Sequence, residues 1–410
     1  MMKGLINFIL TVVLIFNVQA ALALYRIPTL YISTKDGKAV TSRDYWKDST
    51  TLRLVLPDNT VAYKSAMVAI KARGHSTFNK PKKPYTFRLP EEKGLLGMHS
   101  DRRWILLANF MDHSNIRNSL VMEISRQTAL DWTPDGRFVD VVLNGRLQGC
   151  YYLIESVEVE KQRLDLDKAK GFLVEGDDYD DGMTFYTPVR KLPLHVRFPE
   201  KVSDEQQAAI EQRFNEIERL LYQGTDADVE KLFGKYIDTE SFIDWWLVHE
   251  LAQNPEPNGP RSCYFHDRGD GVLRMGPVWD FDLAFITVGL DAGGDIRPAR
   301  FNRPDVKLLT GDSLYDAGSL WYGRLFRDKL FKQQAKNRWK TLKPRFESLI
   351  KTIDAWEKQL TPSANANDSI WNGQDPARFD TRETFATSIA NVKSVYQYRL
   401  KSLDKLINGM

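Results

Sequence analysis

The sequence predicts an α+β fold with two lobes and a cleft between them, a β-rich first half followed by a helical second half. Three observations lead to this prediction. Alternating apolar and polar residues separated by turn signals dominate the first half. Apolar residues at helical spacing dominate after residue 200. The chain has 410 residues, of which 42% are apolar, so it is long enough for two domains or one large two-lobed domain.

The first 23 residues differ from the rest of the chain. They carry one lysine, then an apolar core, then small residues, and Ala21 and Ala23 fit an A-x-A cleavage site. This pattern predicts a signal peptide at 1–23 and a mature chain that begins near Leu24. The alternative is an uncleaved membrane anchor. We expect a secreted, periplasmic or cell-surface protein with no stable membrane span after cleavage, because no second long apolar stretch follows.

Strand patterns fill the next part of the chain. An N-terminal β extension at 24–65 contains alternating segments, and a β-rich N-lobe follows at 66–175. The strands expected in these two regions are 27–34, 51–56, 66–74, 83–90, 102–110 and a segment that begins at 170. Between them, 138–159 is predicted to be a hairpin with Asn144-Gly145 in its turn.

One helix is expected inside the N-lobe and several after it. The helix at 112–130 has Ser114 as its candidate cap. A helical C-lobe with a catalytic loop and a metal-binding strand is predicted at 176–345, and a C-terminal helical region at 346–410. The expected helices are 203–223, which opens on a Ser203–Gln206 capping box, a more buried one at 238–254, and most of 319–406 with a break at 361–380. A hairpin is expected at 262–282.

Charge and cysteine content limit the possible functions. The net charge is +3, from 57 basic and 54 acidic residues, and no long basic block is interleaved with aromatics, so we expect no nucleic-acid partner. The two cysteines are Cys150 and Cys263. Export would permit a disulfide, but the apolar and aromatic neighbours of both favour two separately buried thiols.

A basic loop lies between two predicted strands. Arg73, Lys80, Lys82 and Lys83 gather around it. A loop with several cations and exposed backbone N–H groups suits an anion such as phosphate. The alternative is a solvated basic hairpin.

Two aspartates stand two residues apart in the apolar run "GPVWDFDLAF". On a strand, Asp280 and Asp282 would share one face, with roughly 6–7 Å between their Cα atoms. One carboxylate at the end of a strand suits Mg²⁺ whose shell is completed by phosphate oxygens. The alternatives are a pair with Arg261 or a lysine, or the carboxylate pair of a glycosidase.

Two further segments carry candidate polar residues. A proline-rich loop after the helix at 238–254 presents Asn254, Glu256, Asn258 and Arg261, which suits a functional loop or a plain proline turn. Glu123 lies among apolar residues on the helix at 112–130. It is expected either to be exposed or to hold a lysine of the sheet, as the lysine–glutamate pair of protein kinases does.

Taken in order, these segments resemble the CotH kinase family. The matching text includes "RGHSTFNKPKKPYTFRL", "WILLANFMDHSNIRNSL", "LNGRLQGCYYLIESV", "SFIDWWLVHELAQNPEPNGPRSCYFH" and "GPVWDFDLAF", and it covers roughly Ala66 to Phe346. The resemblance implies an atypical protein-kinase-like two-lobed fold in a secreted bacterial protein. It also implies the use of ATP and Mg²⁺, or Mn²⁺, to transfer the γ-phosphate to Ser or Thr of an envelope or secreted protein, or of the chain itself.

The resemblance also implies roles for particular residues. Lys83, or Lys82, resembles the lysine that holds the ATP phosphates, with Arg73 beside it. Glu123 is similar to the helix partner of that lysine. Asp280 resembles the metal-binding aspartate, and Asp282 is the alternative metal ligand. Asn254 and Glu256 stand at the catalytic-loop position.

The chain departs from the family pattern at one position. Many family members have Asn-x-Asp after the long helix, where this chain has Asn254-Pro255-Glu256. A glutamate is one methylene longer and can still accept a proton from a hydroxyl. This difference motivates a second hypothesis, a kinase-like surface binding protein with impaired transfer. A third, a glycan-active hydrolase, rests on ten tryptophans and the two aspartates, although most of the tryptophans lie in apolar patterns typical of a core.

Overall fold

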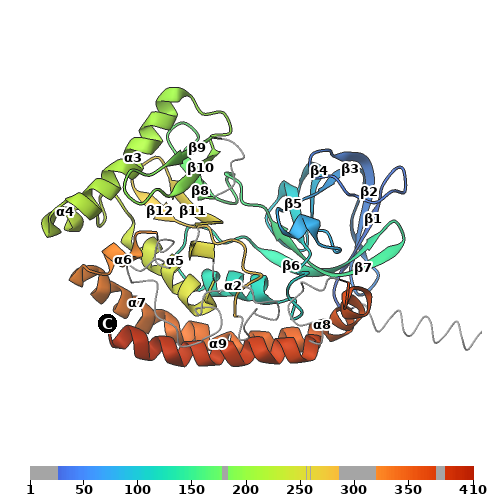
Figure 1. The fold of residues 1–410 in the computed structure, drawn as a ribbon. Helices are drawn as coiled ribbons and strands as arrows, with labels where there is room; N and C mark the ends of the chain where they lie inside the picture. Colours follow the sequence, from blue (N-terminus) through green and yellow to red (C-terminus); the bar gives the residue numbers. More distant parts are fainter. Residues whose placement is uncertain (1–25, 178–182, 255, 259, 286–319, 375–383) are drawn as a thin grey trace, which may run out of the picture. The chain divides into compact units, whose positions relative to one another are not determined.

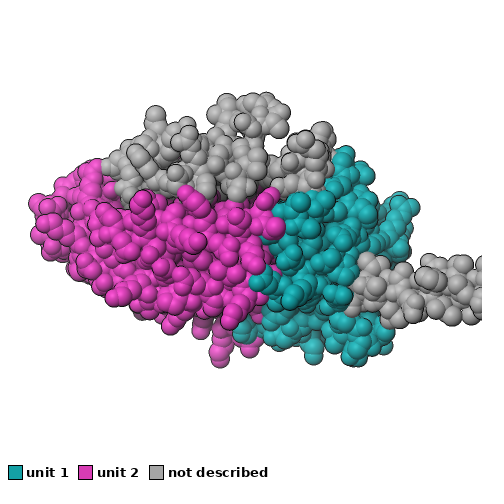
Figure 2. Space-filling model, turned by 90° about the horizontal axis from the view of Figure 1, so that it is seen from below, with its two compact units in different colours: residues 1–115, 136–155, 354–389 teal, residues 116–135, 156–353, 390–410 magenta. Residues whose placement is uncertain are grey.

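The computed structural model describes residues 26–177, 183–254, 256–258, 260–285, 320–374 and 384–410. The predicted signal peptide at 1–23 lies outside these residues. The chain forms two compact units, which Figure 2 distinguishes by colour. Unit 1 comprises residues 1–115, 136–155 and 354–389, and unit 2 comprises 116–135, 156–353 and 390–410. The predicted α+β composition, with a β-rich first half and a helical later part, is confirmed.

Unit 1 is built on a closed barrel of seven strands (Figure 1). In barrel order these are β1 (Thr29–Ser33), β2 (Lys47–Val55), β3 (Val61–Ala72), β4 (Tyr85–Lys93), β5 (Asp101–Leu107), β7 (Arg146–Glu155) and β6 (Gly136–Leu143). Neighbouring strands are antiparallel except where β1 and β6 close the barrel in parallel. Closure leaves the barrel without open edges. Strands of the predicted β extension and of the predicted N-lobe therefore belong to the same barrel.

Short-range signals in the sequence correctly located parts of this barrel. Asn144 and Gly145 have φ values of 50° and 75° and join β6 to β7, so the predicted hairpin is confirmed. Alternate residues of β3, such as Val68 and Ile70, point into an apolar core, and the residues between them point outward. The loop between β3 and β4 contains a short 3₁₀ turn, η1 (Thr77–Asn79).

Helix α8 (Ile350–Trp371) contradicts the break predicted at 361–380, because it continues through Pro362. A proline inside a helix removes one backbone donor, which would otherwise bond the carbonyl four residues earlier. That carbonyl belongs to Lys358, and it accepts a hydrogen bond of 2.9 Å from the Arg26 guanidinium instead. A residue more than three hundred positions away thus satisfies the group that the proline leaves open. Residues 375–380 of the predicted break lie outside the described residues.

Unit 2 contains a second sheet and most of the helices (Figure 1). The sheet order is β12 (Leu273–Met275), β11 (Cys263–Asp267), β8 (Phe172–Gly176), β10 (Pro193–Phe198) and β9 (Thr184–Tyr186). The hairpin of β11 and β12 was predicted, whereas β9 and β10 were not. Both are short, with three residues in β9 and six in β10.

The helices of unit 2 surround a buried central one. They are α2 (Arg117–Arg126), α3 (Asp204–Gln223), α4 (Asp226–Glu230), α5 (Thr239–Ala252), α6 (Tyr322–Leu325) and α7 (Lys329–Ser348), and α9 (Phe385–Asn408) belongs to this unit from residue 390. Helix α5 is buried on nearly all sides, as predicted. The capping box of Ser203 and Gln206 is present in α3. The predicted Ser114 cap is wrong: α2 begins three residues later, and the Ser114 hydroxyl bonds the Asp112 carboxylate.

The described residues include no helix that is both long and apolar enough to cross a membrane. The interpretation of most tryptophans as core residues is confirmed. Those that are buried are Trp104, Trp132, Trp245, Trp246, Trp279, Trp321 and Trp339. Tryptophans used in this way are not available as a sugar-binding platform.

Candidate functional site

The segment that carries Asp280 and Asp282 is not a strand, so the predicted strand face is wrong. Strand β12 ends at Met275, and 276–285 is irregular. Its backbone donors bond other elements: Phe281 N donates to Asn118 Oδ1 of α2 at 2.8 Å, and Phe285 N donates to the carbonyl of Ala252 at 2.8 Å. The segment is therefore held in place at two points by helices of unit 2.

Asp280 has an unusual backbone conformation within this segment. Its φ is +61°, in the left-handed region that non-glycine residues rarely occupy. Such a conformation costs of order 1 kcal/mol or more and persists where the surroundings enforce it. The buried Phe281 that follows fixes the segment, and the Asp280 side chain is exposed. Asp282 begins the next turn and is half-buried. The two carboxylates therefore differ in environment, which favours Asp280 as the residue presented to a ligand.

The end of α5 brings Asn254 to the same place. Gln253 ends the helix in a left-handed conformation with φ of 52°, and Asn254 follows, fully buried. The Asn254 amide nitrogen lies 3.4 Å from His249 Nδ1 and 3.4 Å from the Asp280 carbonyl oxygen. Within the described part of the chain, its Oδ1 atom has no hydrogen-bond partner. A buried polar atom without a protein partner is costly, so Asn254 Oδ1 is able to accept a hydrogen bond from water or to coordinate a cation.

Glu256 lies just beyond Asn254, in the 3₁₀ turn η2 (Glu256–Asn258). Its side chain is half-buried, and the Arg261 amide donates to its backbone carbonyl at 3.2 Å. The structure thus places Asn254, Glu256 and Asp280 in one unit and brings Asn254 into contact with the backbone of Asp280. Pro255 lies outside the described residues.

These residues fit a divalent cation that is bound mostly by a substrate. An amide oxygen such as Asn254 Oδ1 and a carboxylate such as that of Asp280 are ligands that Mg²⁺ accepts. Across the described ranges there is no cluster of three or more His, Cys, Asp or Glu residues that could hold a metal ion. Such a site would need phosphate oxygens and water to complete the coordination shell of the metal, and Mg²⁺ in proteins is usually bound in this way.

The two lysines of the basic loop have different surroundings in unit 1. Lys82 is 1% exposed, and its ammonium donates to the carbonyls of Ala108 at 2.6 Å and Cys150 at 2.5 Å and to Asn367 Oδ1 of α8 at 2.7 Å. It also lies 4.3 Å from the centroid of the Tyr151 ring. An ammonium group has three donors, and here all three have acceptors. Lys82 is therefore a structural residue in this fold, whereas the phosphate role that the resemblance implies remains a prediction for Lys83.

Lys83 and Arg73 stand at the two ends of the β3–β4 loop. The Arg73 amide donates to the carbonyl of Pro84 at 3.1 Å, which closes the loop. Lys83 is half-buried, donates to the carbonyl of Phe78 at 2.5 Å and lies over its ring. Gly74 has φ of +91°, and a Cβ there would lie 2.3 Å from Thr77 Oγ1, so the turn requires glycine.

Glu123 lies on α2 in unit 2. Its carboxylate pairs with Arg126 on the same helix at 2.7 Å, and both side chains are half-buried. Lys83 belongs to unit 1. The glutamate–lysine pair implied by the resemblance, and the convergence of Lys83 with Asp280, therefore remain predictions.

The cysteine prediction is confirmed, since Cys150 and Cys263 are free and buried. Burial raises the pKa of both thiols. The Asp140 carboxylate adds to this effect at Cys150, and the Glu256 carboxylate adds to it at Cys263. Neither thiol is poised to be a nucleophile, because a raised pKa leaves little thiolate near neutral pH.

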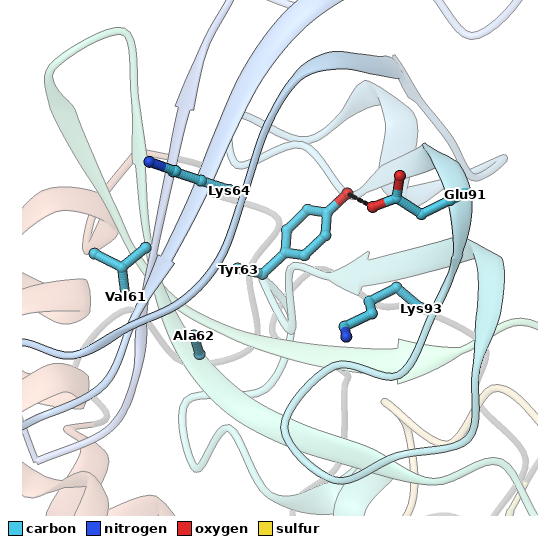
Figure 3. Close-up of a pocket in the computed structure, with 6 residues that line it drawn as sticks. All are labelled: Val61, Ala62, Tyr63, Lys64, Glu91 and Lys93. Atoms are coloured by element: carbon cyan, nitrogen blue, oxygen red, sulfur yellow. Dashed lines mark hydrogen bonds between the residues drawn. The ribbon is translucent and has the colours of Figure 1, made fainter.

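A shallow hollow of about 530 Å³ lies on the barrel of unit 1 (Figure 3). It is lined by Val61, Ala62, Tyr63, Lys64, Glu91 and Lys93, and the Tyr63 hydroxyl lies 3.4 Å from the Glu91 carboxylate. None of the residues predicted from the sequence lines it. Its lysines are exposed, so it lacks the buried polar groups that usually orient a small ligand.

The sequence analysis missed two residues that shape the site. Asn118 holds the backbone beside Asp280, and the ring of His249 lies 4.9 Å from that of Phe281. Both are buried polar residues on helices. A polar residue on an otherwise apolar helical face was the available signal, but that pattern does not reveal which partner it meets.

Two comparisons with known proteins place the chain in a family. The family model described as CotH kinase protein matches residues 70–403, which is most of the chain. The chain belongs to the CotH kinase protein family. It is also 23% identical over 292 residues to the inner spore coat protein H of Bacillus subtilis (strain 168), an alignment that covers 70% of this chain and 74% of that protein.

Proposed function

We propose that this protein is an exported, metal-dependent kinase that transfers the γ-phosphate of ATP to Ser or Thr of an envelope or secreted protein, within an atypical kinase-like fold. Membership of the CotH kinase protein family supports the reaction class. The observation that carries the site assignment is the fully buried Asn254, whose Oδ1 has no hydrogen-bond partner among the described residues and whose amide lies beside Asp280.

Each residue has a definite role in this proposal. Bound ATP and Mg²⁺ would supply the transferable phosphoryl group and neutralise part of its charge. Asn254 Oδ1 and the Asp280 carboxylate would hold the metal, with Asp282 as the alternative ligand. The Glu256 carboxylate would orient the acceptor hydroxyl and accept its proton. Lys83 would position phosphate oxygens as a point charge, with Arg73 beside it.

The test uses the mature chain from Leu24, incubated with γ-labelled ATP and Mg²⁺ or Mn²⁺, with the chain itself and a generic Ser/Thr-rich protein as acceptors. We expect label transfer that Asp280→Asn and Asn254→Ala each lower by at least a hundredfold. Glu256→Gln should lower transfer by about 10²–10⁴-fold, the contribution typical of a general base, and its matched control is Glu205→Gln, at an exposed site on α3. Undiminished transfer in Asp280→Asn would disprove the metal assignment.

A second candidate is a binding protein that retains nucleotide but does not transfer phosphate. The longer Glu256 side chain, at the position where an aspartate is expected, is the observation that favours it. Thermal stabilisation by Mg-ATP without label transfer would support this function. If Glu256→Asp then restored transfer, the length of that side chain would be the cause.

A further inference from the structure

The outer surface of the barrel carries cations held against aromatic rings. The segment before β2 runs beside the end of β3, where the Ala72 amide donates to the carbonyl of Ser42 at 2.9 Å. This places the ring of Trp46 between two cations: Lys71 Nζ lies 5.0 Å from its centroid and the Arg88 guanidinium 4.8 Å. Both belong to outward-pointing positions of β3 and β4.

The same arrangement recurs at the neighbouring loop. Phe78 of η1 has the Arg43 guanidinium 5.5 Å from its centroid and Lys83 Nζ at 5.1 Å. Arg43 also donates to the carbonyl of Gly74 at 3.4 Å. We call Arg43, Trp46, Lys71, Phe78 and Arg88 the basic face. Four cation–π contacts therefore lie on two rings within residues 43–88.

The cations of the basic face form no ion pair with a carboxylate of the described residues. This holds for Arg43, Lys71 and Arg88, and also for Lys83. The nearby Asp36 is occupied by Lys47 at 2.7 Å, a contact that lowers the pKa of Asp36 to about 2.

The strand register adds a further positive charge. Arg88 stands directly opposite Arg103 of β5. Like charges opposite each other destabilise a sheet unless an anion lies between them or nearby. The register therefore adds to the concentration of positive charge at this part of the barrel.

The positions of these cations fit an extended acidic peptide. Lys71 stands opposite Thr86, so Lys71 and Arg88 form a diagonal pair on adjacent strands, and such pairs lie about 7–8 Å apart. Alternate side chains of an extended peptide are roughly 6.6–6.8 Å apart, which is close to the spacing of this pair. Guanidinium groups also bind carboxylates through two parallel hydrogen bonds.

An anionic bilayer fits the basic face less well. Binding to a membrane surface needs a contiguous apolar face that enters the lipid. The large apolar side chains exposed beside the cations are Tyr45, next to Trp46 and 78% exposed, and Met67 on the outer face of β3, 66% exposed. Two single side chains suit contacts with apolar residues placed between the acidic ones of a peptide.

We propose that the basic face is a docking surface for an extended acidic segment of a partner protein, with carboxylates at alternate positions. This inference stands apart from phosphate transfer, because Lys71, Arg88 and Trp46 take no part in the proposed reaction. Its success or failure is measured by binding alone.

The experiment measures binding of a fluorescent twelve-residue peptide, with Glu at every second position and Val or Ser between, to the mature chain by anisotropy. We expect micromolar to submillimolar binding that weakens with salt, and no binding of the same peptide with Gln for Glu. Lys71→Gln with Arg88→Gln should weaken binding about tenfold, as expected for two exposed charge pairs. Trp46→Leu should weaken it a few-fold at unchanged net charge.

The matched control is Lys64→Gln with Lys93→Gln, which removes the same charge from the same barrel at the hollow in Figure 3. Binding should remain within twofold of the unaltered chain. Thermal melting of each variant verifies folding. Equal losses in the two double variants would overturn the proposal, because the effect would then be one of net charge. Binding to vesicles with one-third anionic lipid but not to the acidic peptide would also overturn it, in favour of a membrane.

Discussion

Replacing Lys82 with Met tests whether this lysine stabilises the fold or binds nucleotide. Met fills a similar apolar volume but cannot donate hydrogen bonds. The substitution leaves three buried acceptors, the carbonyls of Ala108 and Cys150 and Oδ1 of Asn367, without the donor that now lies 2.5–2.7 Å from each. An unsatisfied buried acceptor costs about 1–3 kcal/mol. Even near the low end for each of the three acceptors, the free energy of unfolding falls by about 3–5 kcal/mol.

The assay is thermal unfolding followed by circular dichroism, together with urea denaturation. For a domain of about 150–250 residues, 1 kcal/mol corresponds to about 2–4 °C in Tm. We therefore expect Lys82→Met to lower Tm by about 6–20 °C. The control is Lys83→Met, which loses one bond, to the carbonyl of Phe78, and should change Tm by only a few degrees. If Lys82→Met kept its Tm within 2 °C while losing nucleotide affinity, the structural role assigned to Lys82 would be refuted.

Three further predictions concern buried polar groups. Burial raises the pKa of Asp140 from 3.8 to about 6. The folded protein therefore binds this proton more tightly than the unfolded chain does, and the free energy of unfolding falls as pH rises from about 4 to about 6. In urea denaturation, Asp140→Asn should raise the free energy of unfolding at pH 8 by at most about 3 kcal/mol and change it little at pH 4. A larger increase at pH 4 than at pH 8 would contradict this prediction. Cys150 and Cys263 should not react with a thiol reagent in the native protein at pH 8 and should both react in guanidinium, since burial raises their pKa values; rapid native labelling of either would disagree. Asp244→Ala should lower the free energy of unfolding by about 3–5 kcal/mol, because this fully buried carboxylate accepts two hydrogen bonds of 2.6 Å from Arg338. The control is Glu240→Ala, which removes the exposed carboxylate paired with the same arginine. A loss no greater than that of the control would refute the stabilising role of Asp244.

Much of the local structure could be predicted from the sequence because its causes lie close together in the chain. The Asn144-Gly145 turn needs positive φ at both residues, and these are residue types that accept it. The capping box at Ser203 joins groups three residues apart. The incorrect expectations arose where distant residues intervene. Helix α8 continues through Pro362, and the Lys358 carbonyl that the proline leaves open accepts a hydrogen bond from Arg26, a contact that no local pattern reveals.

The candidate site shows the same division. The matching segments between Ala66 and Phe346, taken in order, were sufficient to identify the family, and the residue types of Asn254, Glu256 and Asp280 were sufficient to nominate ligands. Their environments were not predictable. The aspartates were expected on one strand face, but helices α2 and α5 take the backbone donors of their segment and hold Asp280 at a φ of +61°.

The sequence by itself determined the alternation of the barrel strands, the buried helix α5 and the membership of the CotH kinase protein family. Only the tertiary structure decided which lysine is structural. Lys82 and Lys83 are adjacent and chemically identical, yet Lys82 meets Asn367, 285 residues away, and is buried. The physical reason is that a side chain's role depends on its desolvation and on its partners. Both are set by segments that the fold brings together from opposite ends of the chain.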